Sequence, residues 1–146
     1  ALPALARLRP TTSMEDLTVP PTRLPDAAEA IEKIPARLSV EGMDLGNFGH
    51  VADGNMHPTF VYDERVQEQK AAFFKGMDIL YREIVFPMGG SCTGEHGIGL
   101  IRADYIELEH GKKAVDLMRS IKGLFDPNLI LNPGKGKGGP YPLRRE

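Results

Sequence analysis

The order of apolar and polar residues predicts short strands and helices that alternate along the first half of the chain. Residues 14–19 alternate, which is typical of a strand with one buried face. Apolar residues recur at helical spacing over 24–34, and we expect Pro35 to end or kink that helix. A β-hairpin over roughly 44–61 follows. Strand, helix, strand, strand is an α+β pattern rather than that of a doubly wound parallel sheet.

The second half of the chain is predominantly helical. The longest helical pattern runs over 64–86, and its wide apolar face predicts burial on more than one side. A helix over about 103–110 should end at Gly111, and a further helix should end at Asp126-Pro127.

The two ends of the chain carry weaker signals. Residues 1–12 have no clear partner element, so we expect a loose N-terminal arm. Residues 134–146 are rich in glycine and basic residues, which favours a flexible, solvated tail. The domain proper is then expected over 13–133.

Two histidines flank a turn signal in the predicted hairpin. Asp53-Gly54 is a strong signal for a two-residue turn, because both central positions need positive φ. Counting outward from this turn places His50 directly opposite His57, with their Cβ atoms about 4.5–5.5 Å apart. Two imidazole nitrogens can converge on one metal ion from that distance. Spacing alone leaves a second interpretation open, in which each histidine is a half-buried structural residue.

Composition narrows the classes of function. At 146 residues the chain fits one domain. A net charge of -2 without a sustained basic stripe gives no reason to expect nucleic acid as a partner. Cys92 is the single cysteine, so an internal disulfide is excluded and a reducing compartment is favoured. No apolar run approaches the roughly 20 residues of a membrane span, and we expect a cytoplasmic protein.

Three ordered motifs resemble those of one known family. They are Gly49–His57, Cys92–Gly99 and the ending Phe125–Lys135. Together they are similar to the C-terminal domain of FAD-linked 2-hydroxy-acid dehydrogenases, flavoenzymes of the vanillyl-alcohol oxidase superfamily that oxidise D-lactate, glycolate or D-2-hydroxyglutarate. The resemblance covers about residues 13–135 in order and with matching spacing.

The resemblance implies both a fold and a missing partner. It implies part of a ferredoxin-like antiparallel sheet with helices over 13–62, followed by a small helical subdomain over 63–133. In the family both parts pack against an FAD-binding domain, and this chain contains no nucleotide-binding glycine fingerprint of its own. We therefore expect a fragment or split subunit whose flavin, FAD, is bound by another domain or subunit. Association into a homo-oligomer is left open.

The resemblance also assigns roles to residues. His50, His57 and Glu95 match the family's ligands to a divalent metal ion, and His96 matches its general base. We expect zinc, although two imidazoles and a carboxylate also suit manganese or iron. The implied substrate is a small D-2-hydroxy acid of the lactate or glycolate type.

Two further residues have weaker assignments. Thr59 could contact the substrate, but a threonine in a strand is more often structural. Asn132 could approach the flavin, but Asn132-Pro133-Gly134 is equally typical of a turn. The family member that acts on hydroxyglutarate has a lysine near the first strand, and Met14 or Glu15 stands there in this chain. This difference weakens the assignment of hydroxyglutarate as the substrate.

Two alternatives belong to other functional classes. One is a stand-alone metal-binding remnant without redox activity. The other is a small zinc hydrolase that uses the same three ligands with His96 as the base. The sequence does not identify the hydroxy acid, the metal or the electron acceptor.

Overall fold

The structure is a computed structural model and describes residues 1–128 and 130–132. The chain divides into two compact units, Ala1–His96 and Gly97–Glu146. The predicted flexible tail over 134–146 lies outside the described residues.

The first unit is built on three antiparallel strands, each interrupted once. Their segments in chain order are β1 (Thr11–Met14), β2 (Leu17–Thr18), β3 (Asp44–Gly46), β4 (Gly49–His50), β5 (Asn55–Met56) and β6 (Thr59–Tyr62). The segments form two small sheets, in the orders β1-β6-β3 and β2-β5-β4. The pairing of Gly46 with Thr59 continues in step as the pairing of Gly49 with Met56, so both sheets follow one register.

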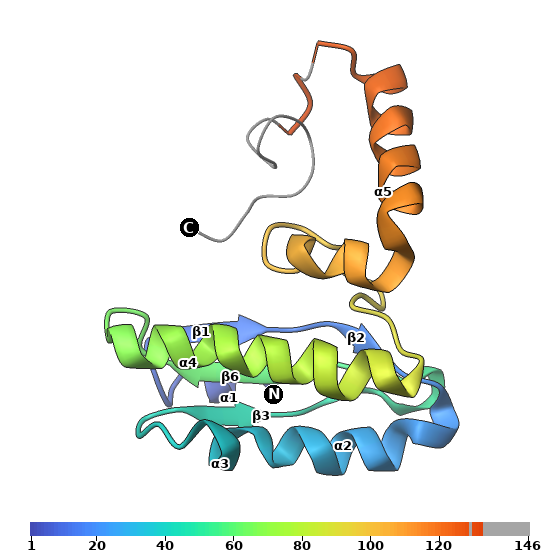
Figure 1. Cartoon of the computed structure of the whole chain (residues 1–146). Coiled ribbons are helices and arrows are strands. Elements are labelled where there is room, and N and C mark those ends of the chain that lie inside the picture. The colour runs from blue at the N-terminus through green and yellow to red at the C-terminus, as the bar shows by residue number, and fades with distance from the viewer. Residues whose placement is uncertain (129, 133–146) are drawn as a thin grey trace. The chain divides into compact units, whose positions relative to one another are not determined.

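The helices of the first unit lie before, between and after these strands. A short α1 (Leu2–Leu5) precedes the first strand, α2 (Leu24–Glu32) and α3 (Ile34–Leu38) connect the first strand to the second, and α4 (Gln67–Asp78) follows the third. Figure 1 shows α2, α3 and α4 running alongside the strands. After α4 the chain returns to the sheet, where Ser91 forms an antiparallel bridge with Thr18 of β2. Strand, helix, two strands, helix and a returning edge is the ferredoxin-like order, and the predicted α+β class is confirmed.

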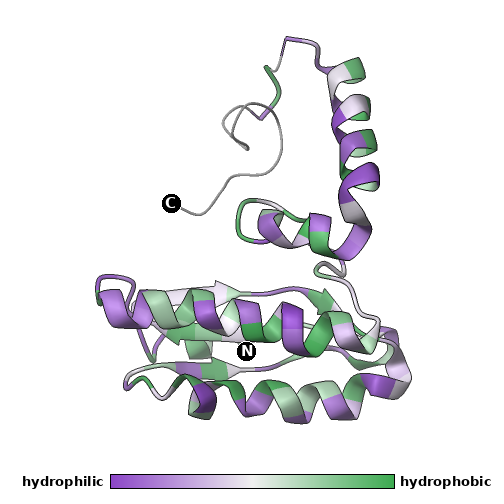
Figure 2. Cartoon of the chain, viewed as in Figure 1, coloured by the Kyte–Doolittle hydropathy of each residue, from purple (hydrophilic) through white to green (hydrophobic). Residues whose placement is uncertain are grey.

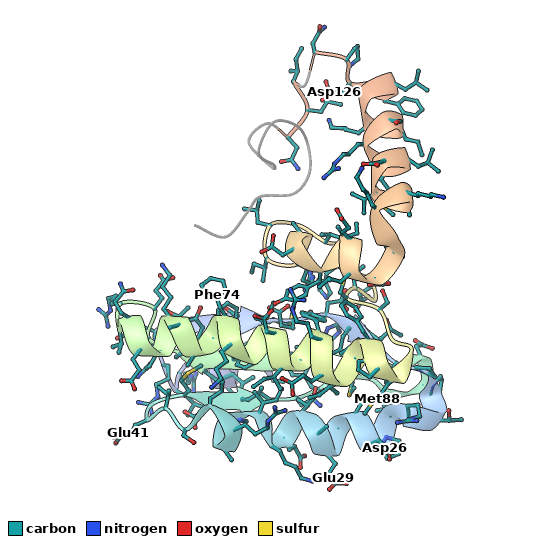
Figure 3. All side chains as sticks on the ribbon, in the orientation of Figure 1. Asp26, Glu29, Glu41, Phe74, Met88 and Asp126 are labelled. Atoms are coloured by element: carbon teal, nitrogen blue, oxygen red, sulfur yellow. The ribbon has the colours of Figure 1, made fainter. Side chains whose placement is uncertain are left out.

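The predicted helix over 24–34 is present as two helices that meet near Pro35. Pro35 lies in the first turn of α3, where its missing N–H group is tolerated. Glu29 of α2 points away from the strands (Figure 3). The kink therefore occurs where the proline predicted it.

The core of the first unit lies between the central strand and α4. Phe73 of α4 packs against Phe60 and Tyr62 of β6, with ring centroids 5.5 and 5.0 Å apart. A Cβ added at Gly76 would lie 2.8 Å from the Phe60 ring, so glycine there lets α4 approach the sheet closely. Figure 2 shows hydrophobic and hydrophilic residues alternating along α2 and α4, as expected for helices with one buried face.

The segment predicted as one helix over 64–86 changes its winding. After α4 the chain continues as a π-helical segment, Ile79–Val85, and a 3₁₀ turn, Phe86–Met88. Wide turns of this kind are rare, and apolar periodicity does not distinguish them from an α-helix.

The N-terminal residues are more ordered than the sequence predicted. Leu2–Leu5 form α1, and a Cβ at Gly46 would meet the Leu5 side chain at 2.8 Å, so α1 packs against β3. Thr11 and Thr12 pair with Tyr62 and Val61 in β6. The first strand therefore begins before residue 13.

The second unit contains the predicted C-terminal helices. A 3₁₀ turn, Ala103–Tyr105, leads into α5 (Ile106–Phe125), which Gly111 interrupts with φ of 77° and ψ of 161°. Beyond α5, the Asp126 carboxylate accepts hydrogen bonds from the Ile130 and Leu131 N–H groups. The predicted breaks at Gly111 and Asp126 are confirmed. Within the described part of the chain, no helix is both long and apolar enough to cross a membrane.

Candidate metal centre

The turn between β4 and β5 is longer than the sequence predicted. Val51–Asp53 form a 3₁₀ turn, and Gly54 follows with φ of 73°. His50 consequently pairs with Asn55, so the prediction that His50 stands directly opposite His57 was wrong by two residues. A shift of two residues keeps every side chain on its original face. His50 and His57 therefore still share one face, as diagonal rather than direct neighbours.

The two histidines converge on one carboxylate oxygen. Their rings lie 5.6 Å apart between centroids. The Nε2 atoms of His50 and His57 each lie 3.2 Å from Glu95 Oε1. The His57 side chain is 5% exposed, whereas those of His50 and Glu95 are 61% and 53% exposed. The group is thus anchored inside the protein at His57 and open to solvent at its other two members.

Glu95 reaches this position because a buried aspartate fixes its backbone. Asp16, in the break between β1 and β2, is 1% exposed. Its Oδ2 accepts hydrogen bonds from the N–H groups of Gly94, Glu95 and His96 at 2.8–2.9 Å, and from Thr93 Oγ1 at 2.9 Å. Burial alone would raise the pKa of Asp16, but these hydrogen bonds and one from Asn55 hold that pKa well below its usual range. The carboxylate is therefore an anionic anchor for residues 93–96.

Asn55 connects this anchor to the hairpin. It is 6% exposed, and its Nδ2 donates to Asp16 Oδ1 at 2.7 Å and to the Leu17 carbonyl at 2.9 Å. Both partners are acceptors, so the NH₂ group of Asn55 must face them, because a carboxamide oxygen in that place could bond to neither.

His96 lies beside the group without joining it closely. Its ring centroid is 5.1 Å from that of His57, and its Nε2 is 3.7 Å from Glu95 Oε1. The His96 side chain is 42% exposed. It can therefore exchange protons with solvent or with a bound molecule.

His50, His57 and Glu95 fit a divalent ion. Their ligand atoms all lie within 4.8 Å of one another. Ligand atoms of a tetrahedral zinc site with bonds of about 2.0–2.1 Å are about 3.3 Å apart. The 3.2 Å separations between Glu95 Oε1 and the two Nε2 atoms match that spacing. Two of the three separations in this trio therefore already fit a small bound ion.

A second set of potential ligands, Asp16, His57 and His96, overlaps the first. Asp16 Oδ2 already accepts four hydrogen bonds from residues 93–96, and binding an ion there would compete with all of them. The first set is the better site because its ligand atoms are not engaged in this way.

A recess formed mainly by residues with polar side chains adjoins the exposed side of the trio. Its volume is about 240 Å³. It is lined by Thr18, His50, Asp53, Asn55, Gly94 and Glu95. A molecule of a few heavy atoms that occupied this recess would lie next to two of the three candidate ligands.

Residues 1–136 match the family model for the C-terminal domain of FAD linked oxidases. The chain belongs to this family. The resemblance inferred from the motifs is thus confirmed, and the matched region includes residues 1–12.

Relatives of this FAD-linked oxidase domain include two bacterial proteins and a plant protein. It is 40% identical over 135 residues to the glycolate oxidase subunit GlcD of Bacillus subtilis, which covers 92% of this chain and 28% of the relative. It is 36% identical over 137 residues to GlcD of Escherichia coli K12, covering 92% and 26%. It is 34% identical over 120 residues to the mitochondrial D-lactate dehydrogenase (cytochrome) of Arabidopsis thaliana, covering 82% and 20%. The chain therefore spans less than a third of the length of these relatives.

The two weaker sequence predictions have different surroundings in this FAD-linked oxidase domain. Thr59 is fully buried in β6, and its Oγ1 donates to the His57 carbonyl at 3.1 Å, which favours the structural interpretation. Asn132 lies in the second unit with φ of 53°, a left-handed conformation typical of a turn. The contact of Thr59 with substrate and the contact of Asn132 with flavin both remain predictions.

Sequence reasoning did not identify Asp16 or Asn55 as parts of the site. A signal for the first was present in the acidic pair Glu15-Asp16, which lies inside the predicted strand, and both residues are buried. Buried carboxylates need several hydrogen bonds or a cation, so an acidic pair inside a predicted strand indicates a polar network. Asn55 carried no comparable signal beyond its place in the histidine motif.

Proposed function

We propose that this chain is the substrate- and metal-binding part of an FAD-dependent oxidoreductase that converts a D-2-hydroxy acid of the lactate or glycolate type into its 2-oxo acid. A separate domain or subunit would bind the FAD. The observation that carries the proposal is the convergence of His50 Nε2 and His57 Nε2 on Glu95 Oε1, at 3.2 Å each, with His96 beside them. The names of the relatives, a glycolate oxidase subunit and a D-lactate dehydrogenase, support the substrate class.

In this proposal His50, His57 and Glu95 hold a divalent ion, zinc by preference. An ion held by these residues would supply Lewis-acid chemistry, which lowers the pKa of a substrate hydroxyl group, and the FAD of the other domain or subunit would supply the hydride acceptor.

The remaining chemistry belongs to side chains of this domain. His96 takes the hydroxyl proton on a ring nitrogen, and its 42% exposed side chain allows that proton to pass on to solvent. The recess beside His50 and Glu95 admits the small acid. Asp53 in the wall of this recess would repel a second carboxylate, which favours monocarboxylic over dicarboxylic hydroxy acids.

The metal assignment can be tested on the protein expressed from its own gene. We expect stoichiometric zinc in the wild type by elemental analysis after dialysis, and loss of that zinc in His57→Ala. His110→Ala is the matched control, because His110 lies on α5 in the second unit and should leave the zinc content unchanged. Equal zinc content in wild type and His57→Ala would reject the three-ligand site.

The role of His96 needs a different measurement. With FAD-binding partner present, D-lactate- or glycolate-dependent dye reduction should fall by about 10²- to 10⁴-fold in His96→Gln, the usual range for loss of a general base. The zinc content should stay that of the wild type, because His96 is not among the proposed ligands. A fully metal-loaded protein that reduces no dye with any small 2-hydroxy acid would instead favour the stand-alone metal-binding alternative.

A further inference from the structure

Asp16 divides its two carboxylate oxygens between two parts of the metal centre. Oδ2 faces the backbone of residues 93–96 and accepts four hydrogen bonds there. Oδ1 accepts one hydrogen bond, from Asn55 Nδ2 at 2.7 Å, and lies 3.6 Å from His57 Nδ1. With a single donor on Oδ1, that oxygen still has a lone pair available for one more donor.

His57 Nδ1 is a buried polar atom that needs a partner. It has no hydrogen-bond partner among the described residues, and the His57 side chain is 5% exposed. The separation of 3.6 Å from Asp16 Oδ1 is too long for a hydrogen bond. A shift of the ring by about half an ångström would bring the pair within the usual 2.7–3.2 Å range. Buried orphan atoms of this kind are uncommon, and each indicates a missing contact.

The two ring nitrogens of His57 face two different carboxylates. Nδ1 faces Asp16 at 3.6 Å, and Nε2 faces Glu95 at 3.2 Å. A neutral imidazole carries one N–H group and can donate to only one of them. If Nδ1 carries the hydrogen, the lone pair of Nε2 points at Glu95, an arrangement that a cation between Nε2 and the Glu95 oxygen would stabilise.

We propose that Asp16 is a positioning residue that holds His57 in the Nδ1–H tautomer, with Nε2 free to bind a metal ion, while it fixes Glu95 and His96 through their backbone N–H groups. The proposal rests on the proposed function in one respect, that the ligand atom of His57 is Nε2. Metal-binding histidines are commonly oriented by a carboxylate on their second nitrogen, and removing that carboxylate weakens metal binding by about 10- to 100-fold.

Asp16→Asn is the informative variant because its carboxamide has one acceptor and one donor. The four donors of residues 93–96 attract the carboxamide oxygen, which leaves the NH₂ group in the place of Oδ1. There it faces His57 Nδ1 and also Asn55 Nδ2, whose hydrogen bond to residue 16 is lost. That NH₂ group donates to Nδ1 and so favours the Nε2–H tautomer, in which the metal-binding lone pair is lost. Thr93→Val is the matched control, because it removes one donor to Oδ2 without touching the side that faces His57.

The first measurement is the tautomer of His57 in the metal-free protein, from nitrogen-15 NMR of the imidazole ring at mildly alkaline pH. We expect Nδ1–H in the wild type and in Thr93→Val, and Nε2–H in Asp16→Asn. A wild-type His57 in the Nε2–H tautomer would overturn the proposal, whether or not the variant folds.

The second measurement is the affinity for zinc, by titration with zinc sulfate. It should fall about 10- to 100-fold in Asp16→Asn and change by less than about threefold in Thr93→Val. A folded Asp16→Asn with the wild-type tautomer and wild-type zinc affinity would also overturn the proposal. If the wild type bound no zinc but its tautomer still changed in Asp16→Asn, the metal site would be rejected while control of the His57 ring by Asp16 would be supported.

Discussion

Gly94, in the segment that carries Glu95, lies against Asn55 of the hairpin, and replacing it with alanine should disrupt both stability and the metal centre. A Cβ built at residue 94 would lie 2.0 Å from Asn55 Nδ2 and 2.9 Å from Thr18 Oγ1. Real Cβ atoms do not approach other heavy atoms this closely, so either Asn55 or the backbone of residue 94 has to move.

Either movement costs free energy. Asn55 cannot withdraw without breaking its bonds to Asp16 Oδ1 and the Leu17 carbonyl, and a buried polar group left unpaired costs about 1–3 kcal/mol. Overpacking itself typically costs about 1–3 kcal/mol. If the backbone moves instead, the Gly94 N–H bond to Asp16 Oδ2 is strained together with those of its neighbours. We therefore expect Gly94→Ala to destabilise the first unit by about 2–6 kcal/mol.

Urea unfolding monitored by circular dichroism measures this cost, and Gly89→Ala is the matched control within the first unit. Gly89 has φ of 76°, and no atom of the described residues lies within 4 Å of an added Cβ, so its substitution costs only the left-handed conformation, about 1–2 kcal/mol. Zinc affinity should fall in Gly94→Ala and persist in Gly89→Ala. A Gly94→Ala variant that loses no more stability than Gly89→Ala, or that keeps full zinc affinity, would refute the clash with Asn55 as the cause.

Two further predictions concern the first unit away from the metal centre. Tyr81→Phe removes the hydroxyl that donates to the buried Glu15 Oε2 at 2.8 Å and should lower the free energy of unfolding, measured in urea, by about 1–3 kcal/mol. Tyr62→Phe is the control and should cost clearly less, because the Tyr62 hydroxyl lies 3.4 Å from Ser13 Oγ. Equal losses in the two variants would contradict the assigned role of the Glu15 contact. Hydrogen bonds from Arg65 lower the pKa of Asp63 to about 2, so any stability from this pair is present above the ordinary Asp pKa and is lost as pH falls toward 2. In Arg65→Ala, carbon-13 NMR titration should find the Asp63 pKa raised toward its ordinary value. An unchanged pKa would exclude the Arg65 guanidinium as the cause.

Local sequence signals predicted the elements of this domain better than their boundaries. Proline and glycine marked the kink at Pro35 and the break at Gly111, because each residue changes the allowed backbone directly. The π-helical segment Ile79–Val85 was not predictable in this way, since its winding depends on packing rather than on the order of apolar residues. The start of the first strand was also misplaced, because Thr11 and Thr12 are ordered by pairing with β6, a contact distant in sequence.

The sequence predicted His50 and His57 as a ligand pair correctly placed on one face, although the predicted length of the turn between them was wrong. The register was wrong by two residues, yet side chains in a strand alternate with a period of two, so an even shift leaves His50 and His57 on the same face. A shift by one residue would have placed them on opposite faces and removed the site. The sequence therefore predicts which face of the sheet carries two histidines more reliably than it predicts whether they are directly opposite each other.

The position of Glu95 could not be predicted from local pattern. Its backbone is held by Asp16, 79 residues earlier in the chain, and no periodicity links the two. Asp16 also faces His57, so one buried carboxylate contacts both the hairpin ligand and the loop that carries the third ligand. If Asp16 served only to stabilise the loop, a neutral acceptor would suffice on the Oδ2 side. Oδ1 would then have no reason to face His57 Nδ1, a buried ring nitrogen without a hydrogen-bond partner among the described residues. Burying a carboxylate so that both oxygens leave water carries a large desolvation free energy. Control of the His57 ring is a chemical function that explains why a charged residue stands at this position.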